Sequence, residues 1–552
     1  MNVFLKIIVL FLLFFIPFAF AGADPWGMSV LQGGVVLCWL LVLFGKKKLI
    51  FSSVFKPVLL ALGVLIVLTG VQSFFPKTLL DAPVFYPITL MRLYSLEHLS
   101  LFVTYLAVAA LIPQICVSQR DVQKMLLCVV LSALAVALCS VSFPRGGYIF
   151  YFTGRRGGIG PFLNRNHASL FFVLGTLGAL GLMFTSQLKY GRMLSRHQKV
   201  SFYMQQLSFF LLFAGLGTAA IMTRSRGGML ALFSGLFCYG FLCTWALPRQ
   251  LKRRLKGMFI TLIALILCAG WIYTHTDEIN AFAHRSTGVS ADTRKMMYRS
   301  AQRMLQDYPV WGIGVGAMPV AITSYVEWTV PQYIERLHND WLEILLGVGF
   351  AGGIFVLWGV LWFVRLALKR LKRLETRKQL LFAALLSQLF AMAVGSMVDF
   401  HFFIPANALV FFILLGCCCT ATYAKHHVHD ITLRAPLRVL IMLILCASLY
   451  VPMQKTRAWR STVFGKGLKT DAKILQFEQS LSYYPSPRNA VRLGNTYYNA
   501  SLRAATPQEK SELRHKANRL AADYLAKYPR EKELSALYMR SLPLQQTGKS
   551  SL

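Results

Sequence analysis

The chain has 552 residues, 56% of them hydrophobic, and a mean hydropathy of +0.53. Apolar runs of about 20 residues, the length of a helix that spans a bilayer, recur along it and exclude a soluble protein of one or two domains. The net charge of +36 does not indicate nucleic-acid binding, because most basic residues lie in short loops between apolar runs, as membrane topology requires.

Thirteen apolar segments predict an all-α integral membrane protein. The first segment could be a signal peptide, because Ala19-Phe20-Ala21 resembles a cleavage site. Lys6 is the only basic residue near its start, which favours an uncleaved first helix with a cytoplasmic N-terminus. The predicted helices lie near residues 3–20, 27–44, 56–75, 97–114, 125–143, 167–187, 201–222, 228–247, 258–274, 339–366, 379–398, 406–424 and 437–453.

Basic loops set the predicted topology. With the N-terminus inside, each cytoplasmic loop is rich in Lys and Arg, as the positive-inside rule requires. These loops are 46–48, 120–124, 189–199, 249–256, 369–378 and 425–438. The predicted external segments are 76–96, 144–166, 223–227, 275–337, 399–405 and everything after residue 451.

Three external segments are also basic, against the topological bias. Loop 144–166 has four arginines and no acidic residue, the turn 223–227 has Arg224 and Arg226, and loop 275–337 adds Arg285 and Arg294. The simplest partner for such a set is an anion at the outer membrane face, such as a lipid diphosphate. The alternative is that the arginines pair with phospholipid head groups. The turn 223–227 is short and lies between two helices, which favours an anion-binding site over pairing with head groups.

Loop 275–337 is too long to be only a connector. Residues 293–305 predict an amphipathic helix suited to the membrane surface, with Met297, Ala301 and Met304 on its apolar side. The glycine run 312–316 superficially resembles a nucleotide-binding loop but lacks the buried strand and the following helix of that motif. It predicts backbone packed against a ligand or another helix.

The last hundred or so residues form a predicted periplasmic tail. Helices are expected at 471–484, 489–504 and 507–527, with a fourth possible at 530–542, and Leu493 to Ala500 resemble one half of a tetratricopeptide-type hairpin. The predicted domains are therefore a polytopic membrane domain, residues 1–453, and a helical, TPR-like tail, residues 454–552.

The eleven cysteines lie within or at the ends of apolar runs and none forms a CxxC pair, so they predict neither disulfides nor a metal site. No DxD-type or HExxH metal motif lies in the external segments.

His338 is the candidate catalytic residue. It precedes a long apolar helix, whose backbone dipoles disfavour the imidazolium form. A neutral imidazole can act as a general base for a hydroxyl nucleophile. The alternative is a helix-capping or head-group histidine, but His338 shares one face with the basic loops and is followed by Asn339 and Asp340.

Several motifs, in order, resemble the O-antigen ligase family over about residues 145–420. His338-Asn339 with Gly349 and Gly352 is similar to the histidine signature of that family. Residues 160–167, which include Asn164 and Asn166, resemble its glycine–phenylalanine–asparagine stretch, and 224–227 its arginine turn. Residues 294–316 resemble the segment that precedes the histidine in that family, and residues 399–405 resemble its short external segment after the histidine helix.

The resemblance implies a GT-C-type, inverting glycosyltransferase of the bacterial inner membrane that needs no metal or cofactor. The donor would be a glycan on undecaprenyl diphosphate and the acceptor a hydroxyl on a lipid, glycan or protein. By position, His338 would be the base. Arg226 or Arg224, with Arg294 or Arg285, would hold the donor diphosphate, and we favour Arg226 and Arg294. Asp399 either orients His338 or caps a helix.

The thirteenth helix and the tail exceed the twelve-helix plan usual in this family. A polymerase of polysaccharide repeats and a protein O-oligosaccharyltransferase are therefore alternatives to a lipid A-core ligase. A transporter would predict ionisable groups deep in the membrane, whereas here the polar groups gather at helix ends. A scaffold that acts through the tail is the third class, and the tail could bind a protein partner.

Overall fold

The computed structural model describes residues 2–45, 48–77, 86–143, 149–150, 155–156, 158–187, 195–248, 291–326, 334–421, 428–465, 467–528 and 532–542. The expected helix at 258–274 and the candidate Arg285 lie outside these residues. In the described part of the chain the fold is all-α, apart from two small antiparallel sheets. Among the described residues, ten helices are long and apolar enough to cross a membrane, and two shorter apolar helices accompany them.

The membrane helices agree in position with twelve of the predicted segments. They are α1 (Asn2–Phe18), α2 (Pro25–Gly45), α3 (Lys56–Phe74), α4 (Arg92–Ile115), α5 (Gln119–Ser142), α6 (Arg165–Gln187), α7 (Arg196–Met222), α8 (Arg226–Ala246), α13 (Asp340–Arg373), α14 (Thr376–Gly395), α15 (Pro405–Ala421) and α16 (Ala435–Ser448). The candidate span of α16 continues through α17 (Tyr450–Gly465), which runs across the predicted domain boundary at residue 453.

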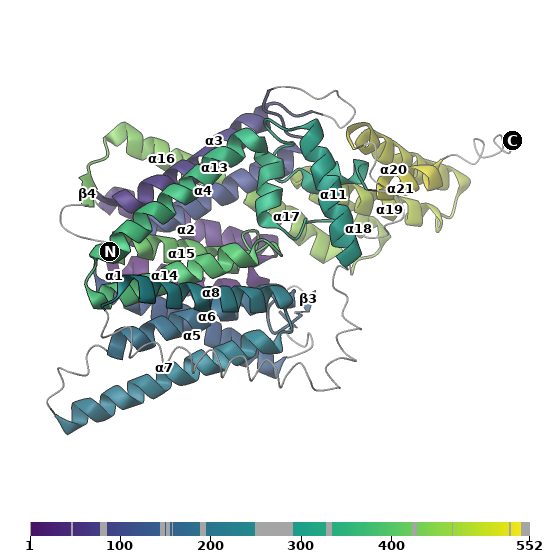
Figure 1. Ribbon diagram of the computed structural model, residues 1–552. Helices are drawn as coiled ribbons and strands as arrows, with labels where there is room; N and C mark the ends of the chain where they lie inside the picture. The colour runs from purple at the N-terminus through teal and green to yellow at the C-terminus, as the bar shows by residue number, and fades with distance from the viewer. Residues whose placement is uncertain are drawn as a thin grey trace.

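Helix α6 is the centre of the bundle. Its apolar window is wholly buried, and it packs against α5, α7, α8 and α14. The approach to α14 is close, since a Cβ on Gly181 would stand 2.3 Å from the Cβ of Ala384. Helix α13 lies against α3, and α15 packs between α14 and α4. These contacts bring the starts of α6, α8, α13 and α15 to the same end of the bundle (Figure 1).

Short elements close the two ends of the bundle. Strands β1 (Leu49–Ser52) and β4 (Val428–Ile431) pair at one end. Strand β1 follows the predicted cytoplasmic loop 46–48, and β4 lies within the predicted cytoplasmic loop 425–438. Strands β2 (Ile149–Phe150) and β3 (Arg155–Arg156) form the second sheet. The remaining short turns are η1 (Phe20–Gly22), η2 (Ser53–Phe55), α12 (Met318–Ala321) and η4 (Ile322–Ser324).

Helix α11 (Ala291–Asp307) confirms the helix expected at 293–305, but its apolar side does not face lipid. Met297 is 2% exposed, and Ala301 and Met304 are fully buried. They belong to a separate apolar cluster with Ile313 and Leu337. The predicted membrane-surface role is therefore wrong for this face, because protein segments that are distant in sequence cover the stripe.

The tail consists of α17 and the helices α18 (Thr470–Tyr483), α19 (Pro487–Ser501), α20 (Pro507–Lys527) and α21 (Lys532–Ser541). Each packs against the next, with a small core that includes Phe477, Leu493 and Leu537. The four predicted tail helices agree with α18 to α21. The start of α17 and the tail lie at the end of the bundle that carries α11, away from the N-terminus and β4 (Figure 1).

Candidate functional site

His338 lies at the junction between a loop and helix α13. Asn339 is the N-cap of this helix and its side-chain oxygen accepts a hydrogen bond from Leu342 N at 3.0 Å. The backbone of His338 is left-handed, with φ of 54°. Such a conformation costs a non-glycine residue of the order of 1–3 kcal/mol and is held only by surrounding contacts. The contacts at the start of α13 therefore fix where the imidazole points.

The link between α14 and α15 is bound to the start of α13. Asp340 N donates to Ser396 O at 2.9 Å, and Asp340 Oδ2 accepts from His401 N at 2.6 Å and from Phe402 N at 2.9 Å. This carboxylate is fully buried and serves the backbone of the link. The link is thereby held so that Asp399 faces the histidine.

His338 and Asp399 form a hydrogen-bonded pair, with Nδ1 and Oδ1 2.9 Å apart. The same carboxylate oxygen accepts from Phe400 N at 2.9 Å, and Oδ2 accepts from Asn166 Nδ2 at 2.5 Å. An ionised carboxylate only accepts, so His338 carries its proton on Nδ1. In the neutral ring Nε2 is then the nitrogen with the lone pair that a general base requires.

Asp399 is almost completely buried, with 1% exposed. Burial by itself raises the pKa of this carboxyl, but the neighbouring His167 and His338 rings, with a charge contribution from His401, outweigh it and hold the pKa well below its usual range. His167 Nε2 is 3.7 Å from Oδ1, longer than a hydrogen bond. Burial and the nearby His167 lower the pKa of His401 to about 3, so that ring is neutral near pH 7 and becomes charged only in the acidic range.

The start of α6 supplies Asn166. Asn164 Oδ1 accepts from Asn166 N at 2.9 Å, an Asx turn that starts the helix. The two predicted asparagines thus differ in role: Asn164 shapes the backbone, and Asn166 contacts Asp399 directly.

Helix α11 contacts both halves of the His338–Asp399 pair. Tyr298 OH donates to His338 O at 3.3 Å, and one turn earlier Arg294 Nη1 donates to Val398 O at 3.3 Å. Arg294 Nε is buried and has no hydrogen-bond partner in the structure. A buried donor without a partner is costly, so this atom can readily take an anionic ligand.

The turn before α8 also reaches Val398. Ser225 caps α8 by accepting from Gly228 N at 3.0 Å. A Cβ on Gly227 would stand 2.9 Å from Val398 Cγ2, so the turn abuts the segment that carries Asp399. Arg226 is exposed and begins α8, and Arg224 is half-buried with φ of 55°. The start of α8 and the Arg294 side chain of α11 therefore both lie against Val398.

Residues 209–357 match the family whose description is O-antigen ligase. The chain carries an O-antigen ligase-like region. This match confirms the predicted resemblance and covers the arginine turn, α11, His338 and the two signature glycines. None of the curated proteins matches the chain.

The signature glycines of the O-antigen ligase-like region shape the start of α13. Gly349 interrupts the helix with φ of 64° and ψ of −173°, a conformation open essentially to glycine alone. A Cβ there would stand 2.3 Å from Val310 O and 2.5 Å from Gly312 N. The glycine run 312–316 thus packs directly against α13, as expected, while a Cβ on Gly352 would meet Val348 and Leu68.

The match supports a membrane protein of the O-antigen ligase or polymerase type. Several contacts in the site were not predicted from the sequence. The His167 ring near Asp399 is one of them. Its sequence signal was its position directly after Asn166 in the same motif. Tyr298 lies one turn after Arg294, a spacing that places both on one side of α11. Among the described residues, no group of three or more His, Cys, Asp or Glu could hold a metal ion.

Proposed function

We propose that the protein is a membrane glycosyltransferase that moves a glycan from undecaprenyl diphosphate to an acceptor hydroxyl at the periplasmic face of a bacterial inner membrane. The acceptor would be lipid A-core or a growing polysaccharide. The observation that carries the proposal is the 2.9 Å hydrogen bond from His338 Nδ1 to Asp399, which directs the Nε2 lone pair away from the carboxylate.

The proposed reaction is a single displacement. His338 Nε2 takes the proton of the acceptor hydroxyl while the oxygen attacks the anomeric carbon, and the bond from that carbon to the diphosphate oxygen breaks. Undecaprenyl diphosphate leaves with the bonding electrons, and the anomeric configuration inverts. Asp399 stabilises the imidazolium that forms, because its carboxylate stays ionised. His338 later releases its proton to water.

Arginines supply the positive charge that the leaving group needs. Arg294 has a buried, unpartnered Nε, and Arg226 stands exposed at the first turn of α8, where helix amides also favour an anion. Guanidinium groups bind phosphate oxygens in a bidentate manner and stabilise developing charge in a partly dry site. Metal independence remains a prediction that rests on this arginine set.

The test uses the native host with its glycan genes intact. His338→Ala should abolish transfer, and His197→Ala, which replaces an exposed histidine at the start of α7, is the matched control. Gel profiles of surface polysaccharide are read together with the amount of undecaprenyl-linked donor. We expect lost surface glycan and accumulated donor in His338→Ala only. Normal surface glycan in that variant would refute the proposal and favour a transporter.

The same gels separate the candidate acceptors. Single repeats on lipid A-core identify a failed polymerase, and bare core identifies a failed ligase. Unchanged lipopolysaccharide with loss of glycan from envelope proteins identifies a protein O-oligosaccharyltransferase.

A further inference from the structure

Two consecutive residues near the start of α4 join the tail to the His338 segment. Glu97 faces the tail, and His98 faces the loop that precedes His338. We propose that the tail helices are a positioning element for His338, acting through Glu97 on one side and through His98 and Arg336 on the other. This inference rests on the proposed function of His338, and its experiment includes a measurement that does not.

On the tail side, Glu97 is held by two helices. Its carboxylate forms an ion pair with Lys455 of α17 and accepts a hydrogen bond from Tyr484 OH, just after α18, at 2.8 Å. Tyr484 is 5% exposed, so this hydroxyl has little access to water. A hydrogen bond to a charged group is stronger than one between neutral groups.

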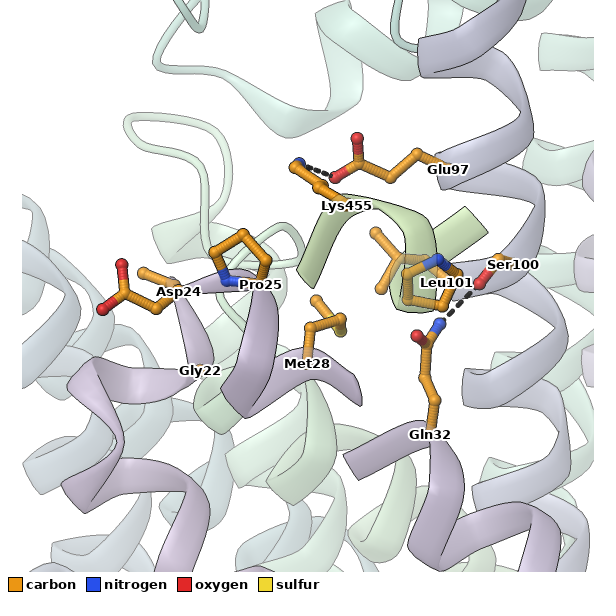
Figure 2. A pocket seen from close by; sticks show the side chains of 11 residues that line it. Gly22, Asp24, Pro25, Met28, Gln32, Glu97, Ser100, Leu101 and Lys455 are labelled. Carbon is orange, nitrogen blue, oxygen red and sulfur yellow. Dashed lines mark hydrogen bonds and ion pairs between the residues drawn. The ribbon is translucent and has the colours of Figure 1, made fainter. Parts of the chain in front are cut away.

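Polar groups make part of the contact between α17 and α4. A cavity of about 40 Å³ lies beneath the Glu97–Lys455 pair, lined by α2, α4 and α17 (Figure 2). On its far side Gln32 Nε2 donates to Ser100 Oγ at 2.6 Å, which links α2 to α4. Since side chains do not fill this space, apolar packing alone does not fix α17 here.

On the site side, His98 and Arg336 continue the connection. His98 Nδ1 lies 2.7 Å from Tyr94 O, which can only accept, so Nε2 is the atom that accepts from Arg336 Nη1 at 3.2 Å. The Arg336 guanidinium also lies 4.0 Å from the centre of the Phe403 ring, on the link that carries Asp399. One arginine thus contacts α4 and the link at once.

Arg336 in turn is tied to the backbone next to His338. Its Nη1 donates to Glu343 Oε1 at 2.6 Å, and Glu343 Oε2 accepts from Leu337 N at 3.1 Å. Leu337 is fully buried and immediately precedes the left-handed His338. A shift of His98 would therefore move Arg336 and Glu343, and with them the Leu337 backbone that sets the direction of the His338 ring.

Two further contacts join the tail to the same region. Tyr528, at the end of α20, packs against the apolar cluster that contains Leu337, and its hydroxyl contacts Met91 Sδ at 3.0 Å. Arg488 of α19 forms an ion pair with Glu335, which lies three residues before His338. Tail helices thus contact both α4 and the loop before His338, which a positioning role requires.

The experiment compares Tyr484→Phe and Glu97→Gln in the full chain, purified in lipid nanodiscs with a lipid-linked glycan donor. Tyr483→Phe, the same change one residue earlier on a partly exposed side chain, is the matched control. We expect Tyr484→Phe to lower kcat roughly three- to tenfold, the range of one hydrogen bond, with an unchanged donor KM. The double variant should lose less than the sum of the two single losses, because both substitutions weaken the same contact between the tail and position 97.

Hydrogen exchange of peptides that contain Leu337 provides the independent measurement. We expect faster exchange there in Tyr484→Phe and Glu97→Gln, and unchanged exchange in α6 and in the control. Wild-type kcat with wild-type exchange at Leu337 would overturn the inference, and so would faster exchange throughout the bundle. If His338→Ala kept full activity, the proposed function would fail, whereas the exchange at Leu337 would still decide whether the tail orders this segment.

Discussion

Replacing Asp399 by Asn removes one negative charge and preserves the shape of the side chain. We expect the amide oxygen to take the place of Oδ1, because two donors, His338 Nδ1 and Phe400 N, point to that position. The amide nitrogen then faces Asn166, whose side chain can rotate to present its oxygen. His338 keeps its tautomer, so the variant isolates the charge of Asp399 from its hydrogen bond.

The size of the effect follows from the charge that develops on His338. Two unit charges about 4 Å apart attract by about 4 kcal/mol at an effective dielectric constant of about 20. A proton that is about half transferred in the transition state develops half of this, so the variant loses about 2 kcal/mol. That loss lowers kcat roughly 30-fold.

The assay is initial-rate transfer from a defined lipid-linked donor by the purified protein in nanodiscs. The donor KM should not change, because Asp399 is buried and its described contacts are with protein groups. Asp471→Asn, at an exposed position in the first turn of α18, is the control and should retain wild-type kcat. A wild-type kcat in Asp399→Asn, or a change confined to the donor KM, would refute the reasoning.

Three further predictions follow from other parts of the site. Arg294→Gln should raise the donor KM roughly tenfold through loss of a charge-assisted contact, while Arg303→Gln, on the exposed side of α11, should leave it unchanged in donor titrations. Gly349→Ala should lower the thermal midpoint of the purified protein, whereas Gly63→Ala, where a Cβ meets no atom within 4 Å, should not. Because the pKa of Asp399 is depressed in the folded protein, its stabilising contribution is complete above the unfolded value of about 3.8 and is lost only as the pH falls towards the lower folded value. The difference in thermal midpoint between wild type and Asp399→Asn should therefore be constant from pH 7 to 5 and shrink below about pH 4, and a difference that shrinks already at pH 6 would contradict this assignment.

The helices were predictable because the length of an apolar run is a local property of the sequence. Twelve predicted segments agree with described helices, and even the interruption of α13 has a local signal in Gly349. The environment of α11 was not predictable in this way. A stripe of Met297, Ala301 and Met304 predicts that one side is buried, but the burial partner, lipid or protein, depends on segments distant in sequence.

The helical structure that follows the last membrane helix was also not predictable from local sequence. Hydropathy predicts an end near residue 453, since the residues that follow are polar. Those residues are nevertheless helical to Gly465. Their polar side chains have partners on other helices, since Lys455 forms an ion pair with Glu97 and Thr462 Oγ1 is hydrogen-bonded to Ser480 Oγ at 2.9 Å. Partners provided by other helices, not local propensity, decide where such a helix ends.

Two carboxylates lie near His338, and the one that is distant in sequence is the one that contacts the ring. Asp340 is two residues from His338, yet it begins α13, where its side chain is directed to the backbone of the link. Asp399 is 61 residues away and reaches the imidazole only because Asp340 holds that link in place. Asp340 Oδ2 accepts both of these backbone amides, so the side chain is turned to the link, and it is the more distant acid that contacts the ring. Asp340 therefore acts on His338 through Asp399, and a variant such as Asp340→Asn should weaken both the link and the His338–Asp399 pair.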